Sequence, residues 1–147
     1  MGYTSIVCGV TGSAHAQKAA LEAAILAKAS NATLTYVYAV DIDFLKRGLA
    51  VELSSRSMEA SFEQLAGHIL NHVEQLALSQ GVTPKKVIRK GPVLEVLQQV
   101  VAEEKADLLV LGHEHRTFFE KAMFKGDVED HAAELKLKTG AEVTIIR

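Results

Sequence analysis

Apolar or β-branched residues gather in five short runs, which alternate with longer amphipathic or alanine-rich stretches. The runs cover residues 5–10, 33–40, 86–90, 107–111 and 141–146. Runs of this length predict strands, and continuous apolar runs are typical of a parallel sheet covered on both faces. The stretches between them predict helices over about residues 15–29 and 54–79, from Gly91-Pro92 onward, and over about 127–138. This alternation predicts a single doubly wound α/β domain, with a parallel sheet and helices on both of its faces.

The predicted helices differ in the side chains that we expect them to bury. The first has mostly small residues on its apolar face, which would allow close packing on a sheet: Ala20, Leu21, Ala23, Ala24 and Ala27. The second has apolar residues at spacings of three and four, the pattern of an amphipathic helix: Met58, Phe62, Leu65, Ile69, Val73 and Leu76. For the third we expect Val93, Val96 or Leu97, Val100 and Val101 to be buried.

Length, net charge and the distribution of apolar residues exclude several classes of protein. The chain has 147 residues, 48% of them hydrophobic, which suits one domain with a sizeable core. A formal net charge of -2 argues against a nucleic-acid-binding protein that neutralises phosphates. No apolar run approaches the roughly 18 residues of a membrane span, and the first residues lack the pattern of a signal peptide. The single cysteine, Cys8, lies in an apolar run and fits a core residue in a reducing compartment, so we expect a cytoplasmic protein.

The strand at residues 107–111 leads into the stretch with the most polar chemistry. Gly112 follows the strand, a loop carries His113, Glu114, His115 and Arg116, and a helix is predicted to start at Gly126-Asp127. In open α/β sheets, a strand that passes through a glycine and a polar loop to a helix N-terminus is where anionic ligands bind. The sequence therefore predicts a ligand site at this end of the sheet.

The order of several short motifs resembles the universal stress protein family over essentially the whole chain. These motifs are Ile6–Val10 before Gly12-Ser13, Ala19-Ala20-Leu21, Thr33-Leu34 leading into Val40-Asp41, Gly91-Pro92, and residues 106–112 before a closing apolar strand. The resemblance implies a five-stranded parallel sheet in the order 3-2-1-4-5, of the adenine nucleotide alpha hydrolase-like type. It also implies a homodimer formed through the last strand, at Val143, Thr144, Ile145 and Ile146.

The family's nucleotide motif is altered in this chain. Relatives that bind ATP carry Gly-x-x-Gly, about nine residues, and then Gly-Ser or Gly-Thr. Gly112 matches the first glycine and Arg116 a basic residue that often follows, but His115 stands at the second glycine. Gly126 comes one residue late, and Asp127 replaces the hydroxyl with a carboxylate, which would repel phosphate and can cap the helix itself. The chain therefore looks closer to the branch that does not bind ATP, and we expect a degenerate pocket and no cofactor.

The alternative is a nucleotide-binding protein that uses ATP with magnesium, with slow hydrolysis. In that case Thr11 would stand where relatives have an aspartate. The resemblance places the pocket at Val10, Thr11, Gly12, Val40, Gly112, His113, His115, Arg116, Gly126, Asp127 and Val128.

Three other groups of residues have more than one interpretation. His113 and His115 could hold a metal, but no third ligand follows from their spacing, and zinc sites need three or four. His68 and His72 share one side of a helix, where a solvated polar face competes with a ligand pair. The apolar cluster after the loop favours core or dimer packing over a lid or a protein-binding patch; its members are Phe118, Phe119, Met123 and Phe124.

No arrangement of residues indicates catalysis. Ser13 and His15 both open a helix, so their proximity in sequence does not imply a base acting on a nucleophile. We therefore predict a non-enzymatic, cytoplasmic stress-response or regulatory homodimer, which could act through a protein partner but not through nucleic acid or a membrane.

Overall fold

A computed structural model describes residues 2–10, 14–40, 55–112 and 135–146. Its strands are β1 (Ser5–Gly9), β2 (Thr33–Val40), β3 (Lys85–Lys90), β4 (Leu108–Gly112) and β5 (Glu142–Ile146). Its helices are α1 (Ala14–Ser30), α3 (Ser55–Ser79) and α4 (Val93–Glu103), and residues 135–139 are also helical. The predicted strands are confirmed, each end lying within one residue of its expected position.

The five strands form one parallel sheet in the order β3-β2-β1-β4-β5. This is the order that the resemblance implied. The chain first winds outward from β1 to β3 and then returns to β4 on the other side of β1, so the winding reverses between β1 and β4. In such sheets a ligand crevice lies at this reversal, outside the carboxyl ends of the strands.

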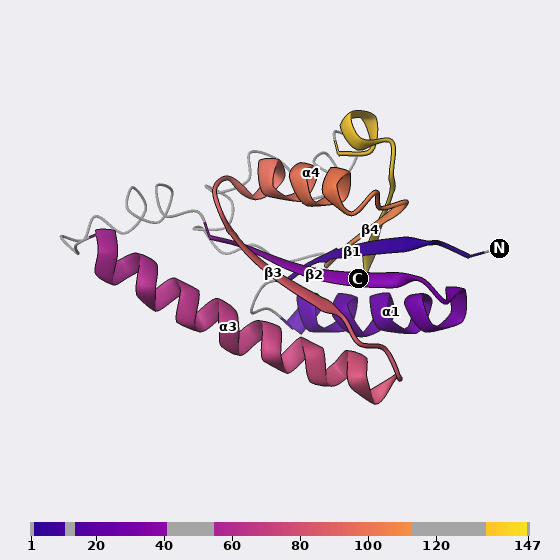
Figure 1. The fold of residues 1–147 in the computed structure, drawn as a ribbon, viewed down its shortest axis with the longest axis horizontal. Helices are drawn as coiled ribbons and strands as arrows, with labels where there is room; N and C mark the ends of the chain where they lie inside the picture. The colour runs from indigo at the N-terminus through magenta and orange to yellow at the C-terminus, as the bar shows by residue number, and fades with distance from the viewer. Residues whose placement is uncertain (1, 11–13, 41–54, 113–134, 147) are drawn as a thin grey trace.

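Helices cover both faces of the sheet, as Figure 1 shows: α1 and α3 lie on one side and α4 on the other. The α1 and α3 side holds one apolar cluster, to which Ile6, Cys8 and Tyr36 contribute from the sheet. The α4 side holds a second, with Val7, Val37 and Leu109. Successive residues of β1 therefore point into different cores, which explains why this strand is continuously apolar. None of the helices in the described part of the chain is long and apolar enough to cross a membrane.

The buried face of α1 is confirmed, and that of α3 is confirmed only in part. In α1 the alanines at 20, 23, 24 and 27 are fully buried and Leu21 is partly buried. In α3, Leu65 is 47% exposed, so its predicted burial was wrong. Of the other predicted residues, Val73 is fully buried, and Ile69 and Leu76 are partly buried against the core. The buried stripe is rotated toward side chains that the pattern did not include, two of them small, which let the helix lie close to α1 and the sheet; these are Ala66, Leu70 and Ala77. The side chains of Met58 and Phe62 are outside the described set.

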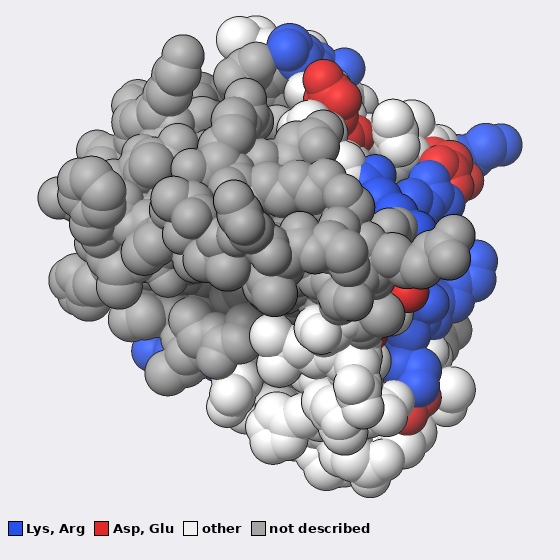
Figure 2. Space-filling model, turned by 90° about the vertical axis from the view of Figure 1, so that its left-hand side faces the viewer, with Lys and Arg blue, Asp and Glu red and all other residues white. Residues whose placement is uncertain are grey.

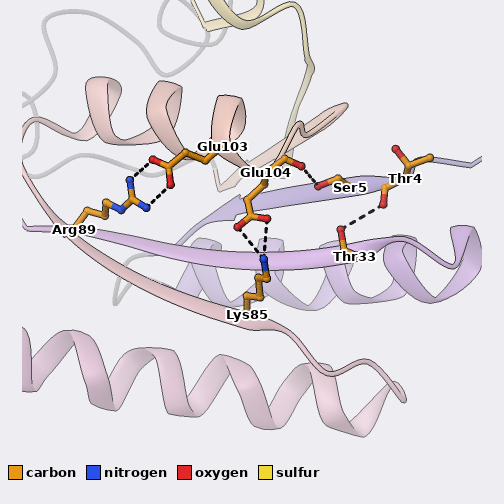
Figure 3. Close-up of polar contacts among 7 residues, drawn as sticks. All are labelled: Thr4, Ser5, Thr33, Lys85, Arg89, Glu103 and Glu104. Carbon is orange, nitrogen blue, oxygen red and sulfur yellow. Dashed lines mark hydrogen bonds and ion pairs between the residues drawn. The ribbon is translucent and has the colours of Figure 1, made fainter.

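Asp107, directly before β4, ties the start of β4 to the start of β1. Its carboxylate accepts hydrogen bonds from the backbone N–H of Thr4 at 3.0 Å and of Ser5 at 3.0 Å. The Thr4 hydroxyl donates a further bond at 3.3 Å. Figure 3 shows the next contact along, in which the Ser5 hydroxyl donates to the carbonyl of Glu104. Partial burial alone would raise the pKa of Asp107, but the donors at Ser5 and Thr4 outweigh it and hold the pKa below its usual value.

Replacing Asp107 with alanine should lower the free energy of unfolding at pH 7 by about 1 kcal/mol, since the site is partly solvent-exposed. Because the folded pKa is the lower one, the carboxylate contributes stability above its unfolded pKa and loses it as the pH falls through the folded pKa. Urea titrations at pH 7 and pH 3 would measure both effects. The difference between the natural chain and the variant should shrink at pH 3; a constant difference would contradict the role of the charge.

One buried hydroxyl has no hydrogen-bond partner in the described structure, that of Thr35 in β2. The residue is 1% exposed. An unsatisfied buried hydroxyl destabilises a fold by about 1–3 kcal/mol. Thr35→Val should therefore raise the midpoint of urea unfolding. The matched control is Thr33→Val on the same strand, whose exposed hydroxyl donates to the Thr4 carbonyl; it should not stabilise, and equal gains from both would refute this explanation.

Candidate functional site

The strands β1 and β4 separate at their carboxyl ends. Their ladder pairs Ile6, Val7 and Cys8 with residues 108–110 and ends there. β1 goes on beside β2, where the N–H of Val10 donates to the carbonyl of Val37 at 2.9 Å. β4 goes on beside β5 as far as Gly112, which lies opposite Ile146. The two central strands thus each stay with their outer neighbour, and a gap in the hydrogen-bonding pattern opens between them at the reversal of the winding.

Three residues of the predicted pocket belong to the described structure, and all three lie at this end of the sheet. Val10 follows β1, Val40 ends β2 and Gly112 ends β4. Val10 and Val40 are buried, whereas Gly112 is partly exposed. The remaining predicted pocket residues lie outside the described residues: Thr11, Gly12, His113, His115, Arg116, Gly126, Asp127 and Val128.

On the α4 side of the sheet, leucine side chains pack over the end of β1. A Cβ at Gly9 would come within 3.0 Å of Leu111 Cδ2 and within 3.3 Å of Leu97 Cδ2. Glycine at this position therefore lets the side chains of α4 and β4 pack directly over the end of β1. The described walls of the site are aliphatic and backbone groups, which suit the flat, uncharged part of a ligand better than a charged part.

Gly91 is a site residue whose role the sequence did not reveal. The sequence marked it as the start of a helix and as part of a family motif, but its N–H also donates to the carbonyl of Val40, the last residue of β2, at 2.9 Å. Its φ is +137°, a conformation that favours glycine. The Gly-Pro pair predicted the helix start, but the bond to β2 depends on how two segments distant in sequence meet.

Gly91→Ala should lower the free energy of unfolding by about 1–3 kcal/mol, because a Cβ is strained at this φ. Gly67→Ala is the matched control: Gly67 lies inside α3, where a Cβ would meet nothing within 4 Å. Alanine suits a helix interior better than glycine, so this control should gain up to about 1 kcal/mol. Urea unfolding measures the free energy of unfolding of both variants. If both variants were stabilised, or both destabilised, backbone strain at residue 91 would not explain the result.

The described residues also decide the interpretation of Cys8 and bear on that of the two α3 histidines. Cys8 is fully buried, and burial raises the pKa of its thiol to about 12, so it stays protonated as a core residue. His68 and His72 are both exposed on α3, as expected for a polar face. Within the described ranges no group of three or more metal-binding side chains comes together. The loop with His113 and His115 and the apolar cluster at residues 118–124 lie outside them.

Solved structures with the same fold are numerous. A universal stress protein in complex with cAMP is 23% identical, with a TM-score of 0.72, over 100% of this chain and 98% of that one. Universal stress protein UspA from Lactobacillus plantarum is 20% identical, with a TM-score of 0.78, over 100% and 99%. The universal stress protein from Archaeoglobus fulgidus in complex with dAMP is 17% identical, with a TM-score of 0.66, over 100% of both chains. At these identities the likeness shows the fold.

No curated protein sequence matches the chain significantly. The model of the universal stress protein family, by contrast, matches residues 2–135, which is most of the chain. Together with the strand order, this match means that the chain belongs to the universal stress protein family.

Proposed function

We propose that this chain is a cytoplasmic, non-enzymatic stress-response regulator that acts as a homodimer joined along β5. The observation that carries the proposal is the contrast between the two edges of the sheet. β5 is an edge strand whose last four residues are partly exposed and mostly apolar. β3, at the other edge, has four basic residues out of six.

The β5 edge has the properties of an association surface. Val143 packs against the core on the α4 side, and Ile146 packs against the core on the α1 side. The strand is held by β4 on one edge and by the two cores on its faces. Among the described residues no strand pairs with its other edge, so backbone groups there are open to a partner beside apolar side chains. Such an edge pairs readily with another strand. A second copy of the same edge, related by a two-fold axis, would give a closed dimer.

The absence of catalysis is proposed from the chemistry of the loop after β4. His115 stands where relatives have a glycine, and Asp127 stands where they have a hydroxyl. A carboxylate at the helix start would occupy the amides that otherwise bind phosphate. On this basis the pocket holds ATP weakly or not at all, and regulation passes through a protein partner.

A second candidate function, nucleotide binding, is favoured by the separation of β1 and β4 at the site. Solved structures with this fold include complexes with cAMP and with dAMP. In this alternative Val10, Val40 and Gly112 would line the adenosine part of the ligand, and Arg116 would reach a phosphate.

Four measurements on the purified full chain test these proposals. Light scattering across a range of concentrations should give the mass of a dimer; a monomer at every concentration would end the dimer proposal. The protein should release no adenine nucleotide on denaturation and should show no saturable binding of ATP with magnesium tighter than millimolar. Saturable binding below that range would overturn the degenerate pocket and favour the second candidate. Elemental analysis of the same sample decides whether a metal is bound.

A further inference from the structure

The strand β3 is bordered by ion pairs on both faces of the sheet. Its four basic side chains alternate, so that Lys85 and Arg89 face α4 while Lys86 and Lys90 face α3. We call the strand cations and their partners the β3 belt. Its pairs are Lys85–Glu104 at 3.1 Å, Arg89–Glu103, Lys86–Glu74 at 3.1 Å and Lys90–Glu63 at 3.1 Å.

The two pairs on the α4 side are visible in Figure 3. Glu103 and Glu104 stand at the end of α4, and the guanidinium of Arg89 donates to both oxygens of Glu103. This bidentate pair holds the pKa of Glu103 below its usual value, so both groups stay charged. Lys86 on the other face also donates to the side chain of Asn71 at 3.0 Å. Figure 2 shows the result at the surface, where basic side chains gather along one side with acidic ones among them.

The belt lies along an edge that is otherwise open to strand addition. β3 pairs with β2 over six positions, and among the described residues it has no strand on its outer side. Unpaired backbone groups there would accept a new strand, and Ile88, 42% exposed, would give it an apolar contact.

A strand added at β3 would have to cover the belt. Cross-strand neighbours approach to about 5 Å, so an added strand would take water from the cations, which lie on both faces. The Lys85 and Lys90 side chains are 66% and 56% exposed and depend on that water. Removing water from charges is unfavourable unless new partners replace it. The β5 strand of another copy has one acidic residue, Glu142, and four uncharged residues. It therefore offers too few carboxylates to pair with four cations.

We infer that the β3 belt closes this edge to a second copy of the chain, so that self-association is confined to β5. Association through β5 rests on the proposed dimer. The inference that the belt prevents strand pairing at β3 does not depend on that dimer. If both edges were open, β5 of one copy could join β3 of the next and the sheets would extend without limit. With β3 closed, two β5 edges meet and assembly stops at a pair.

The test replaces the four strand cations by threonine, which suits a strand: Lys85→Thr, Lys86→Thr, Arg89→Thr and Lys90→Thr. Its mass is measured by light scattering against concentration, well below the melting temperature. We expect a mass that rises with concentration to at least about twice that of the natural chain. The formal net charge, -2 in the natural chain, becomes more negative by four, so charge repulsion would oppose this growth.

The matched control breaks the same four ion pairs from the helix side: Glu63→Gln, Glu74→Gln, Glu103→Gln and Glu104→Gln. It leaves the cations on the strand, so its mass should equal that of the natural chain. Growth of both variants would mean that weakened packing causes association, and would overturn the inference. An unchanged mass of the threonine variant would also overturn it.

A milder variant, Lys85→Thr with Lys90→Thr, serves if the fourfold change prevents folding, since these are exposed side chains at the ends of β3. The mass of this variant should also rise with concentration, but less than that of the fourfold variant. A mass equal to that of the natural chain would contradict the role of the β3 belt. Because every mass is compared with that of the natural chain, the readout remains valid whether that chain is a dimer or a monomer. A monomeric natural chain would refute the proposed dimer without touching the closure of β3.

Discussion

Ile145→Lys is expected to turn the proposed dimer into a monomer and to raise its dissociation constant by at least about 100-fold. Ile145 is one of the four residues of β5 that are only partly buried within one copy. In a dimer paired along β5 the substitution occurs twice, because a two-fold interface uses the same residue on both copies. Each lysine would place an unpaired charge in an apolar contact, which is strongly unfavourable.

Ile88→Lys is the matched control for this prediction. Ile88 is an exposed isoleucine on the opposite edge strand and already stands among lysines. It undergoes the same chemical change outside the proposed interface, so its mass by light scattering should match that of the natural chain. Thermal unfolding of both variants checks that they are folded. If Ile145→Lys stays dimeric, or if Ile88→Lys also dissociates the dimer, association does not use β5.

The fold was largely predictable because its main signals are local. Strands buried on both faces must be apolar at successive positions, and β1 and β4 have this pattern. The alanines of α1 likewise show in the sequence how closely that helix packs. The buried face of α3 was less predictable, since apolar residues such as Leu65 lie beside the true stripe and only contact with α1 and β2 selects among neighbouring positions.

The polar contacts could not be predicted, because each joins segments that are distant in sequence. The sequence shows Asp107 as an acid before a strand, but not that Thr4 and Ser5 lie against it. It shows four cations in β3, but not that α3 and the C-terminal end of α4 with the residue after it each bring two carboxylates to them. The candidate site was predictable in part. The strand order places Val10, Val40 and Gly112 at one end of the sheet, whereas the hydrogen bond from Gly91 to β2 was seen only in the structure.

Tyr36 combines a feature that the sequence predicts with a contact that it does not. Replacing this residue should reduce stability more than any of the substitutions proposed above. The residue is fully buried in β2, and its hydroxyl donates to the carbonyl of Ala20 in α1 at 2.7 Å. Burial, and to a smaller extent Cys8 beside it, raise the pKa of Tyr36 well above its ordinary value, so the hydroxyl remains a donor. The ring was foreseeable as part of a strand; the helix carbonyl that it needs was not.

Tyr36→Ala should lower the free energy of unfolding by about 4 kcal/mol, because it removes the largest fully buried side chain among the described residues and leaves a cavity between β2 and α1. Tyr36→Phe keeps the ring and removes only the donor, so its loss should be about 1 kcal/mol. Tyr3→Phe is the control: its hydroxyl donates to Glu142 at 3.0 Å in an exposed hydrogen bond, which should contribute less than that of Tyr36. Urea unfolding of the three variants orders these effects. If Tyr36→Phe lost as much as Tyr36→Ala, the hydrogen bond to α1 rather than the packing of the ring would hold this part of the fold together.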